Sequence, residues 1–230
     1  MSRTPREARL GGLPVGRAGF LGLVGAGVAG LFWAKDVTGL LGRAVPKNVA
    51  SILPTSGWRI YTIADRMPDI VPAAYRLKIT GAVDRPVTYT LADLRALPRA
   101  EQVSDFHCVT GWSVKNVHWA GVRLQDVLRE SGTKPTAAYL RFVSDEVPYD
   151  DSLTIDQAFL GDVMLAYEQD GQPLSRPHGA PIRLVMPQMY GYKSVKWVTG
   201  IEATETFVPG YWEQHGYDSD AWIGRSNGKS

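Results

Sequence analysis

Strand-type hydrophobic patterns dominate the chain from residue 75 to residue 205. Residues 75–83 alternate between apolar and polar positions, and the alternation ends at Gly81. Further apolar segments have the length of strands, and one of them enters a turn at Asp170-Gly171. These segments are residues 101–109, 138–144, 163–174, 180–187 and 194–205. Because the strands do not alternate regularly with helices, the sequence predicts an α+β fold with mixed β-sheets and short helices.

Two segments carry helical signals. In the segment 90–97, Thr90 is followed three residues later by Asp93, the spacing of a capping box, and Pro98 stops the helix. In the segment 123–132, Leu and Val side chains recur on one face and a glycine follows. The sequence therefore predicts two short helices inside a largely β domain.

The first 73 residues differ from this pattern. Arginines precede an uncharged, glycine-rich run from Ala18 to Ala34, which is typical of an export signal or a short membrane anchor; a helix of a soluble protein is the alternative. We therefore expect residues 1–35 to be such a signal or anchor and residues 36–73 to be a linker that becomes a wrapping arm. Within the arm, residues 56–63 alternate like a short strand. The folded domain is then residues 74–230.

Composition excludes several classes of site. The net charge of +2 and the absence of a basic, aromatic-interleaved patch give no support for nucleic-acid binding. Cys108 is the only cysteine, which rules out an intrachain disulfide, a Cys-rich zinc site and a cysteine-ligated iron–sulfur cluster. The glycine patterns of dinucleotide-binding and P-loop proteins are absent.

Two groups of residues remain as candidates for chemistry. Cys108 can be a small buried apolar residue, or a soft metal ligand if a cofactor supplies the other ligands. His107 is a poor base for it, because neighbours on a strand point to opposite faces. In residues 178–197, His178, Arg183 and two lysines surround glycine turns. This group suits an oxyanion such as phosphate, or it is an ordinary basic surface.

Two long motifs together resemble a known family. "CVTGWSVKNVHWAGVRLQDVL" and "HGAPIRLVMPQMYGYKSVKWVTGIE" are similar to the molybdopterin-binding domain of the sulfite oxidase superfamily. The resemblance is strongest to its bacterial branch, which includes the catalytic subunit of the envelope methionine sulfoxide reductase. It extends from about Trp58 to Trp222 and includes the closing "GYWEQHGY".

The resemblance implies a cofactor and the residues that bind it. Cys108 corresponds to the thiolate ligand of molybdenum, so the pterin dithiolene and this thiol would give the metal three sulfur ligands. The other positions that correspond to molybdopterin contacts are Arg59, Tyr61, Ser144, His178, Arg183, Ser194, Val195 and Lys196. His107, Trp112 and Trp119 either shape the opening or are a surface histidine and tryptophans packed in the core.

The resemblance also implies an activity, with one departure. Sulfite oxidases place arginines after their cysteine, whereas Cys108 is followed by Val-Thr-Gly-Trp, although Lys115 or Arg59 could reach the site. We therefore expect an extracytoplasmic molybdenum oxidoreductase that reduces a small or peptide-borne S- or N-oxide. The alternatives are a sulfite-oxidising dehydrogenase and a non-catalytic protein that retains the fold. Electron exchange would use a membrane haem protein or a cytochrome, and the protein would be membrane-associated if the N-terminal segment is retained.

Overall fold

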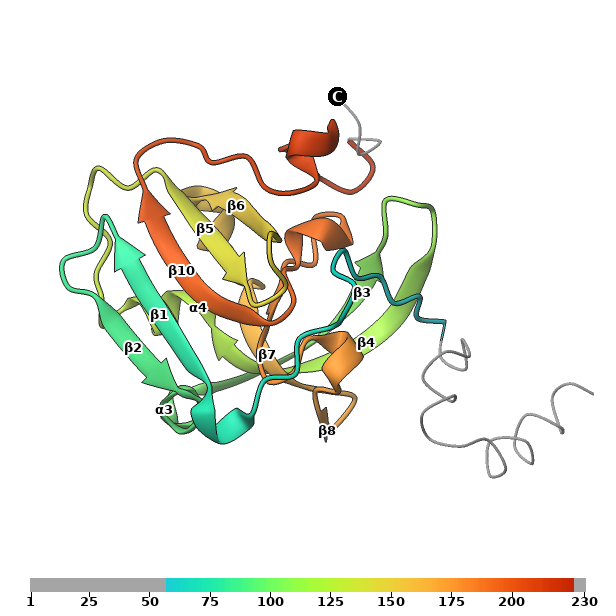
Figure 1. Cartoon of the computed structure of the whole chain (residues 1–230), viewed down its shortest axis with the longest axis horizontal. Helices are drawn as coiled ribbons and strands as arrows, with labels where there is room; N and C mark the ends of the chain where they lie inside the picture. The colour runs from blue at the N-terminus through green and yellow to red at the C-terminus, as the bar shows by residue number, and fades with distance from the viewer. Residues whose placement is uncertain (1–56, 226–230) are drawn as a thin grey trace, which may run out of the picture. The chain divides into compact units, whose positions relative to one another are not determined.

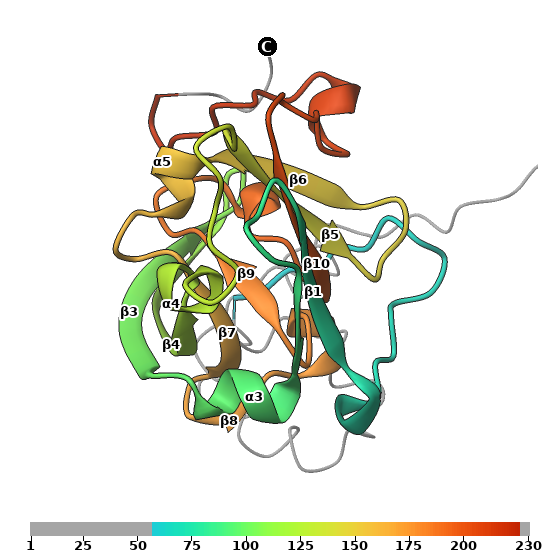
Figure 2. The same ribbon diagram turned by 90° about the vertical axis from the view of Figure 1, so that its left-hand side faces the viewer.

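The computed structural model describes residues 57–225, and the structural statements below concern these residues. They form two sheets, which lie on opposite sides in Figure 2. The first sheet has the order β2-β1-β10-β5-β6. Its strands are β1 (Arg76–Gly81), β2 (Val87–Thr90), β5 (Tyr139–Ser144), β6 (Asp150–Thr154) and β10 (Val198–Thr204). All its pairs are antiparallel except β1 with β10, so the sheet is mixed.

The second sheet is antiparallel and has the order β3-β4-β7-β8 (Figure 1), with β9 paired to β7. Its strands are β3 (Arg99–His107), β4 (Ser113–Arg123), β7 (Met164–Gln169), β8 (Gln172–Pro173) and β9 (Arg183–Val185). Leu165 and Tyr167 of β7 join the main core, whereas Met164 and Ala166 join a second core on the other face. Because both faces of β7 are covered, this strand is apolar without alternation.

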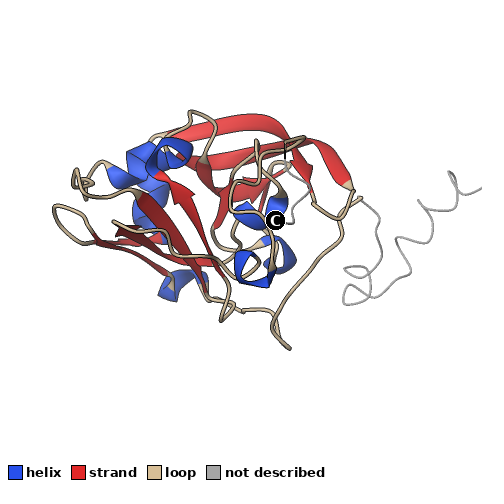
Figure 3. Cartoon of the chain, turned by 90° about the horizontal axis from the view of Figure 1, so that it is seen from above, coloured by secondary structure: helices blue, strands red, loops and turns tan. Residues whose placement is uncertain are grey.

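Helices are few and short beside the strands (Figure 3). The α-helices are α3 (Leu91–Ala96), α4 (Leu124–Leu128) and α5 (Ile155–Ala158), and the 3₁₀ helices are η1 (Pro72–Ala74), η2 (Arg176–His178), η3 (Gly191–Lys193) and η4 (Glu213–His215). No helix within residues 57–225 has the length and apolar character needed to cross a membrane. The predicted α+β class with mixed sheets is confirmed.

Both predicted helices form, with shorter limits than expected. At the start of α3 the Thr90 side chain accepts from the Asp93 N–H and the Asp93 carboxylate accepts from Thr90, so the capping box is present. Helix α4 ends at Leu128, where the Gly132 N–H donates to the Leu128 carbonyl in a left-handed turn with φ of 61°. The short capped helices therefore follow from local sequence.

The arm does not contain the strand predicted for residues 56–63, because residues 57–63 have no strand structure. Its backbone groups bond to side chains of the body instead of to a neighbouring strand. Lys196 Nζ donates to the Tyr61 carbonyl at 2.7 Å, and the Glu146 carboxylate accepts from the Ile63 N–H at 2.9 Å. The alternating apolar side chains have a different role, since they pack on the second core.

The predicted export signal and most of the linker lie outside the described residues. Residues 57–225 belong to one compact unit, so the described part of the arm packs with the domain.

Candidate active site

Cys108 follows the last residue of β3 in the turn that joins β3 to β4. The turn is closed by a hydrogen bond from the Cys108 N–H to the Trp112 carbonyl at 2.9 Å, and by one from the Gly111 N–H to the Cys108 carbonyl at 3.0 Å. Gly111 has a φ of 92°, which favours glycine at this position. The Sγ atom lies 3.2 Å from the Thr110 hydroxyl and is partly accessible. The thiol is therefore presented by a tight turn.

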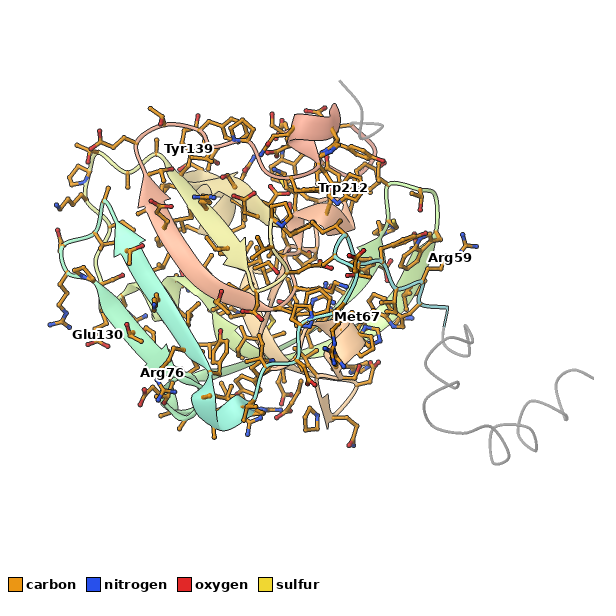
Figure 4. The ribbon with its side chains drawn as sticks, viewed as in Figure 1. Arg59, Met67, Arg76, Glu130, Tyr139 and Trp212 are labelled. Carbon is orange, nitrogen blue, oxygen red and sulfur yellow. The ribbon has the colours of Figure 1, made fainter. Side chains whose placement is uncertain are left out.

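A pocket of about 220 Å³ opens at this thiol. Residues from the arm, the β3–β4 turn, the segment between β7 and β10, and the C-terminal segment line it. Among the predicted site residues, those that line it are Arg59, Tyr61, Cys108, His178, Arg183, Ser194 and Lys196. Figure 4 shows Arg59 on the arm, with its side chain pointing away from the body, and Trp212 on the C-terminal segment.

Two predicted cofactor residues do not line the pocket. Ser144 is buried behind it, where its hydroxyl donates to the Lys196 carbonyl at 2.8 Å and accepts from the Glu146 N–H at 3.0 Å. The Val195 side chain lies in the main core, and its carbonyl accepts from the Leu184 N–H. These residues therefore support the shape of the pocket wall in the structure.

Cations gather at one end of the pocket without a bonded anion. Arg183 is 2 % exposed, and its guanidinium donates only to the backbone carbonyls of His178, Leu184 and Ser194 within the described chain. Lys196 donates to backbone carbonyls as well. Among residues 57–225, no carboxylate lies within ion-pair distance of either side chain. A buried cation without a counterion is costly, so this end of the pocket suits a bound anion.

The pKa shifts of the cationic residues also support a bound anion in this part of the pocket. Burial, and then the charge of Arg183, lower the pKa of Lys196 to about 7, although Glu146 opposes the change. Burial, and then the charges of Arg183 and Lys196, lower the pKa of His178 to about 4. Burial lowers the pKa of Arg183 itself to about 10. A phosphate would relieve the repulsion among these groups, so the residues present fit the phosphate of a cofactor.

His107 does not line the pocket that Cys108 enters. Its Nδ1 is 2.8 Å from the Ser113 hydroxyl, and its Nε2 is 3.9 Å from the Asp105 carboxylate. Lys115 also pairs with Asp105, at 2.7 Å, and does not line the pocket. The expectation that His107 is not placed as a base for Cys108 agrees with this geometry.

Sequence reasoning missed most of the aromatic lining. Trp58, Phe106, Tyr149 and Tyr217 line the pocket beside the predicted residues. They come from the arm, from β3, from the loop before β6 and from the C-terminal segment. The density of aromatic residues was the only available signal, since tertiary contacts bring these segments together.

Comparison with known proteins gives consistent matches. A profile of the family described as "Oxidoreductase molybdopterin binding domain" matches residues 64–212. An uncharacterized oxidoreductase, YuiH, from Bacillus subtilis is 39 % identical over 150 residues, which are 64 % of this chain and 75 % of that protein. A putative protein-methionine-sulfoxide reductase subunit, YedZ1, from Azospira oryzae is 33 % identical over 187 residues, which are 79 % of this chain and 70 % of that protein.

Among solved structures, the sulfane dehydrogenase SoxCD from Paracoccus pantotrophus is similar, with a TM-score of 0.58 and 28 % identity. The match covers 61 % of this chain and 40 % of the SoxCD chain, so the present chain spans less than half of that protein.

Proposed function

The chain belongs to the oxidoreductase molybdopterin binding domain family. On this premise we propose that it reduces an S-oxide at a molybdenum cofactor that Cys108 holds. The family membership confirms the predicted cofactor and enzyme class. The protein is a molybdenum-cofactor-dependent oxidoreductase, and its cofactor is molybdopterin. The substrate, the roles of individual residues, the electron partner and the location are the proposal.

In this proposal the two ends of the pocket have separate roles. The Cys108 thiolate is a soft donor and would hold molybdenum. Arg183 and Lys196 would hold the phosphate of the pterin, beside His178 and Ser194. When bound, the cofactor supplies two-electron oxygen-atom transfer. The chain fixes the cofactor at both ends and shields it with the arm.

The observation that supports an S-oxide substrate is the absence of a cation in the turn that follows the thiol. The turn after Cys108 is Val109-Thr110-Gly111-Trp112, and the neighbouring lining is aromatic. We assign Arg183 and Lys196 to the cofactor phosphate, and the Arg59 side chain points away from the body (Figure 4). A neutral S-oxide needs no cation, whereas sulfite is an anion whose desolvation needs one. The YedZ1 relative, named as a methionine-sulfoxide reductase subunit, supports the same choice.

The net reaction has a simple balance. One S-oxide, two protons and two electrons give one thioether and one water. The electrons come from a redox protein, which we propose to be a membrane haem protein or a cytochrome. We also propose an extracytoplasmic location, because the sequence of residues 1–35 is typical of an export signal or an anchor.

The test is to purify the full chain from cells supplied with molybdate and to measure molybdenum, pterin and two activities. Methionine sulfoxide reduction with reduced viologen dye as donor should proceed, and sulfite oxidation with ferricyanide as acceptor should be slow. The reverse preference would show that the sulfite-oxidising alternative is right.

A ligand variant tests the role of Cys108 separately. Cys108→Ser should abolish turnover but retain pterin, because the phosphate end is unchanged. Thr110→Val is the matched control, since Thr110 contacts the same sulfur at 3.2 Å without being a candidate ligand. Full activity in Cys108→Ser would contradict the proposed role.

A further inference from the structure

An aromatic wall lines the pocket on the side of Cys108. It consists of Trp58 and Tyr61 from the arm, Phe106 from β3 and Trp112 from the turn after Cys108. The ring centroids of Phe106 and Trp112 are 5.7 Å apart, and those of Trp58 and Phe106 are 4.9 Å apart. Tyr61 lies 6.3 Å from Trp112. Each ring therefore contacts the next within the range of favourable aromatic pairs.

The wall borders the cationic residues of the pocket. Phe106 lies 5.6 Å from the Arg183 guanidinium, and Trp58 lies 4.9 Å from the His178 ring. Tyr61 is 52 % exposed and packs on Trp112, and its carbonyl accepts from Lys196 Nζ at 2.7 Å. Trp58 and Phe106 therefore lie beside the buried cationic residues, and Tyr61 brings the wall to solvent.

Trp112 is held in a fixed relation to the thiol. Its carbonyl accepts from the Cys108 N–H at 2.9 Å, which closes the turn between them. Its indole Nε1 is buried and has no hydrogen-bond partner among the described residues. An indole N–H can only donate, and a buried donor without an acceptor costs about 1–3 kcal/mol. Trp112 lines the pocket beside the candidate metal ligand, and its indole donor lacks an acceptor among the described residues, which a bound ligand could supply.

We propose that Trp112 and Tyr61 bind the substrate, and that they select a neutral S-oxide with an apolar arm. The Trp112 Nε1–H donates to the oxide oxygen, and the Tyr61 ring packs against the methyl or alkyl arm on sulfur. Such an oxide is neutral, has a strong acceptor oxygen and has apolar groups that favour aromatic faces. The proposal rests on the proposed function and adds the residues that determine specificity.

The experiment uses molybdopterin-loaded protein and measures kcat and KM for three S-oxides: dimethyl sulfoxide, methyl p-tolyl sulfoxide and a methionine-sulfoxide peptide. Trp112→Phe keeps an aromatic ring but removes the donor. It should raise KM about five- to tenfold for all three substrates, which corresponds to one hydrogen bond. The kcat at saturation should change much less, and the pterin content should equal that of the wild type.

Tyr61→Leu gives a different signature. KM should rise for the tolyl and peptide substrates and remain unchanged for dimethyl sulfoxide, which has no large arm. The matched control is Tyr139→Leu, the same substitution in an aromatic pair of Tyr139 with Phe207, on the β5 side away from Arg59 and the arm (Figure 4). All three KM values should be those of the wild type in the control. If Trp112→Phe folds poorly, Tyr61→Leu still tests the proposal, because Tyr61 is half exposed and its replacement should not disturb folding.

The outcomes distinguish the proposed S-oxide reduction from the proposed substrate roles of Trp112 and Tyr61. If the loaded wild type reduces no S-oxide, the proposed function is wrong. If the wild type reduces S-oxides while both variants keep its KM values, only the substrate roles of Trp112 and Tyr61 are wrong. If Trp112→Phe or Tyr61→Leu loses pterin or molybdenum, the replaced side chain holds the cofactor, and this also overturns the inference.

Discussion

Lys193→Met is predicted to destabilise the domain more than any exposed lysine substitution. Lys193 is 0 % exposed and lies in the 3₁₀ helix η3. Its ammonium donates to Asp151 at 2.7 Å, to the Ser152 carbonyl at 3.0 Å and to the Glu213 carboxylate. It thereby joins η3 to β6 and to the C-terminal segment. Methionine has a similar stem, so the variant removes the charge with little change in packing.

The size of the loss in unfolding free energy follows from the buried carboxylates that would remain without Lys193. Asp151 is 2 % exposed and Glu213 is 4 % exposed, so two carboxylates would stay buried without their cation. Oδ2 of Asp151 already has no partner among the described residues. Removing one partner of a buried ion pair costs about 3–5 kcal/mol, a large part of the roughly 5–15 kcal/mol that stabilises a typical domain.

The stability deficit of Lys193→Met should depend on pH in a definite direction. Burial, and then Glu213, raise the pKa of Asp151, although Lys193 opposes them. Without Lys193 the Asp151 carboxyl should bind a proton still more readily in the folded state. A group with a raised folded pKa contributes stability that is complete below its unfolded pKa and is lost as the pH rises through the folded pKa. The deficit of the variant should therefore be smaller at acidic pH than at neutral pH.

The assay is urea unfolding of the full chain at a series of pH values, with equal cofactor content in all variants. Lys115→Met is the matched control, because Lys115 also contacts a carboxylate at 2.7 Å but is 63 % exposed. The free energy of unfolding of this control should equal that of the wild type within experimental error. Adding Asp151→Asn and Glu213→Gln to Lys193→Met should restore part of the stability. A deficit equal to that of the control, or one that grows on acidification, would refute the reasoning.

Three further predictions concern the pocket. Arg183→Met should purify with much less pterin than the wild type, measured by fluorescence after oxidation, whereas unchanged pterin would contradict the phosphate role. Gly191→Ala should lose about 1–3 kcal/mol in urea unfolding, because the new Cβ would lie 2.2 Å from the Phe106 ring, and wild-type stability would show that the ring moves freely. The pKa of Lys196 is lowered from 10.5 to about 7, so the cofactor-free protein should lose stability as the pH falls from 10.5 through 7. Lys196→Met should flatten this part of the thermal-stability profile, and an unchanged slope would contradict the assignment.

Local sequence was sufficient where the structure depends on neighbours along the chain. The capping box of Thr90 and Asp93 formed as predicted, and the alternation of residues 75–83 gave β1. The two motifs around Cys108 and Arg183 identified the family and the cofactor, because their residue types and spacing are specific. These features need only short-range geometry or a motif of fixed length.

Strand β6 could not be predicted in this way. Its sequence begins Asp150-Asp151-Ser152, which is typical of a turn, yet all three residues are buried. Burial of these groups is possible because distant partners satisfy them: Arg141 pairs with Asp150, and Lys193 pairs with Asp151. Such compensation depends on residues far away in the sequence.

The sequence by itself determined the class of fold, the family, the thiol and the cationic group. Only the tertiary structure decided that residues 57–63 are not a strand, that Ser144 and Val195 lie behind the pocket wall, and that the buried Trp112 donor has no acceptor within residues 57–225. The physical reason is that periodicity and motifs report local geometry. Burial and hydrogen-bond satisfaction depend on which distant segments meet, and here the arm meets a turn about fifty residues further along the chain.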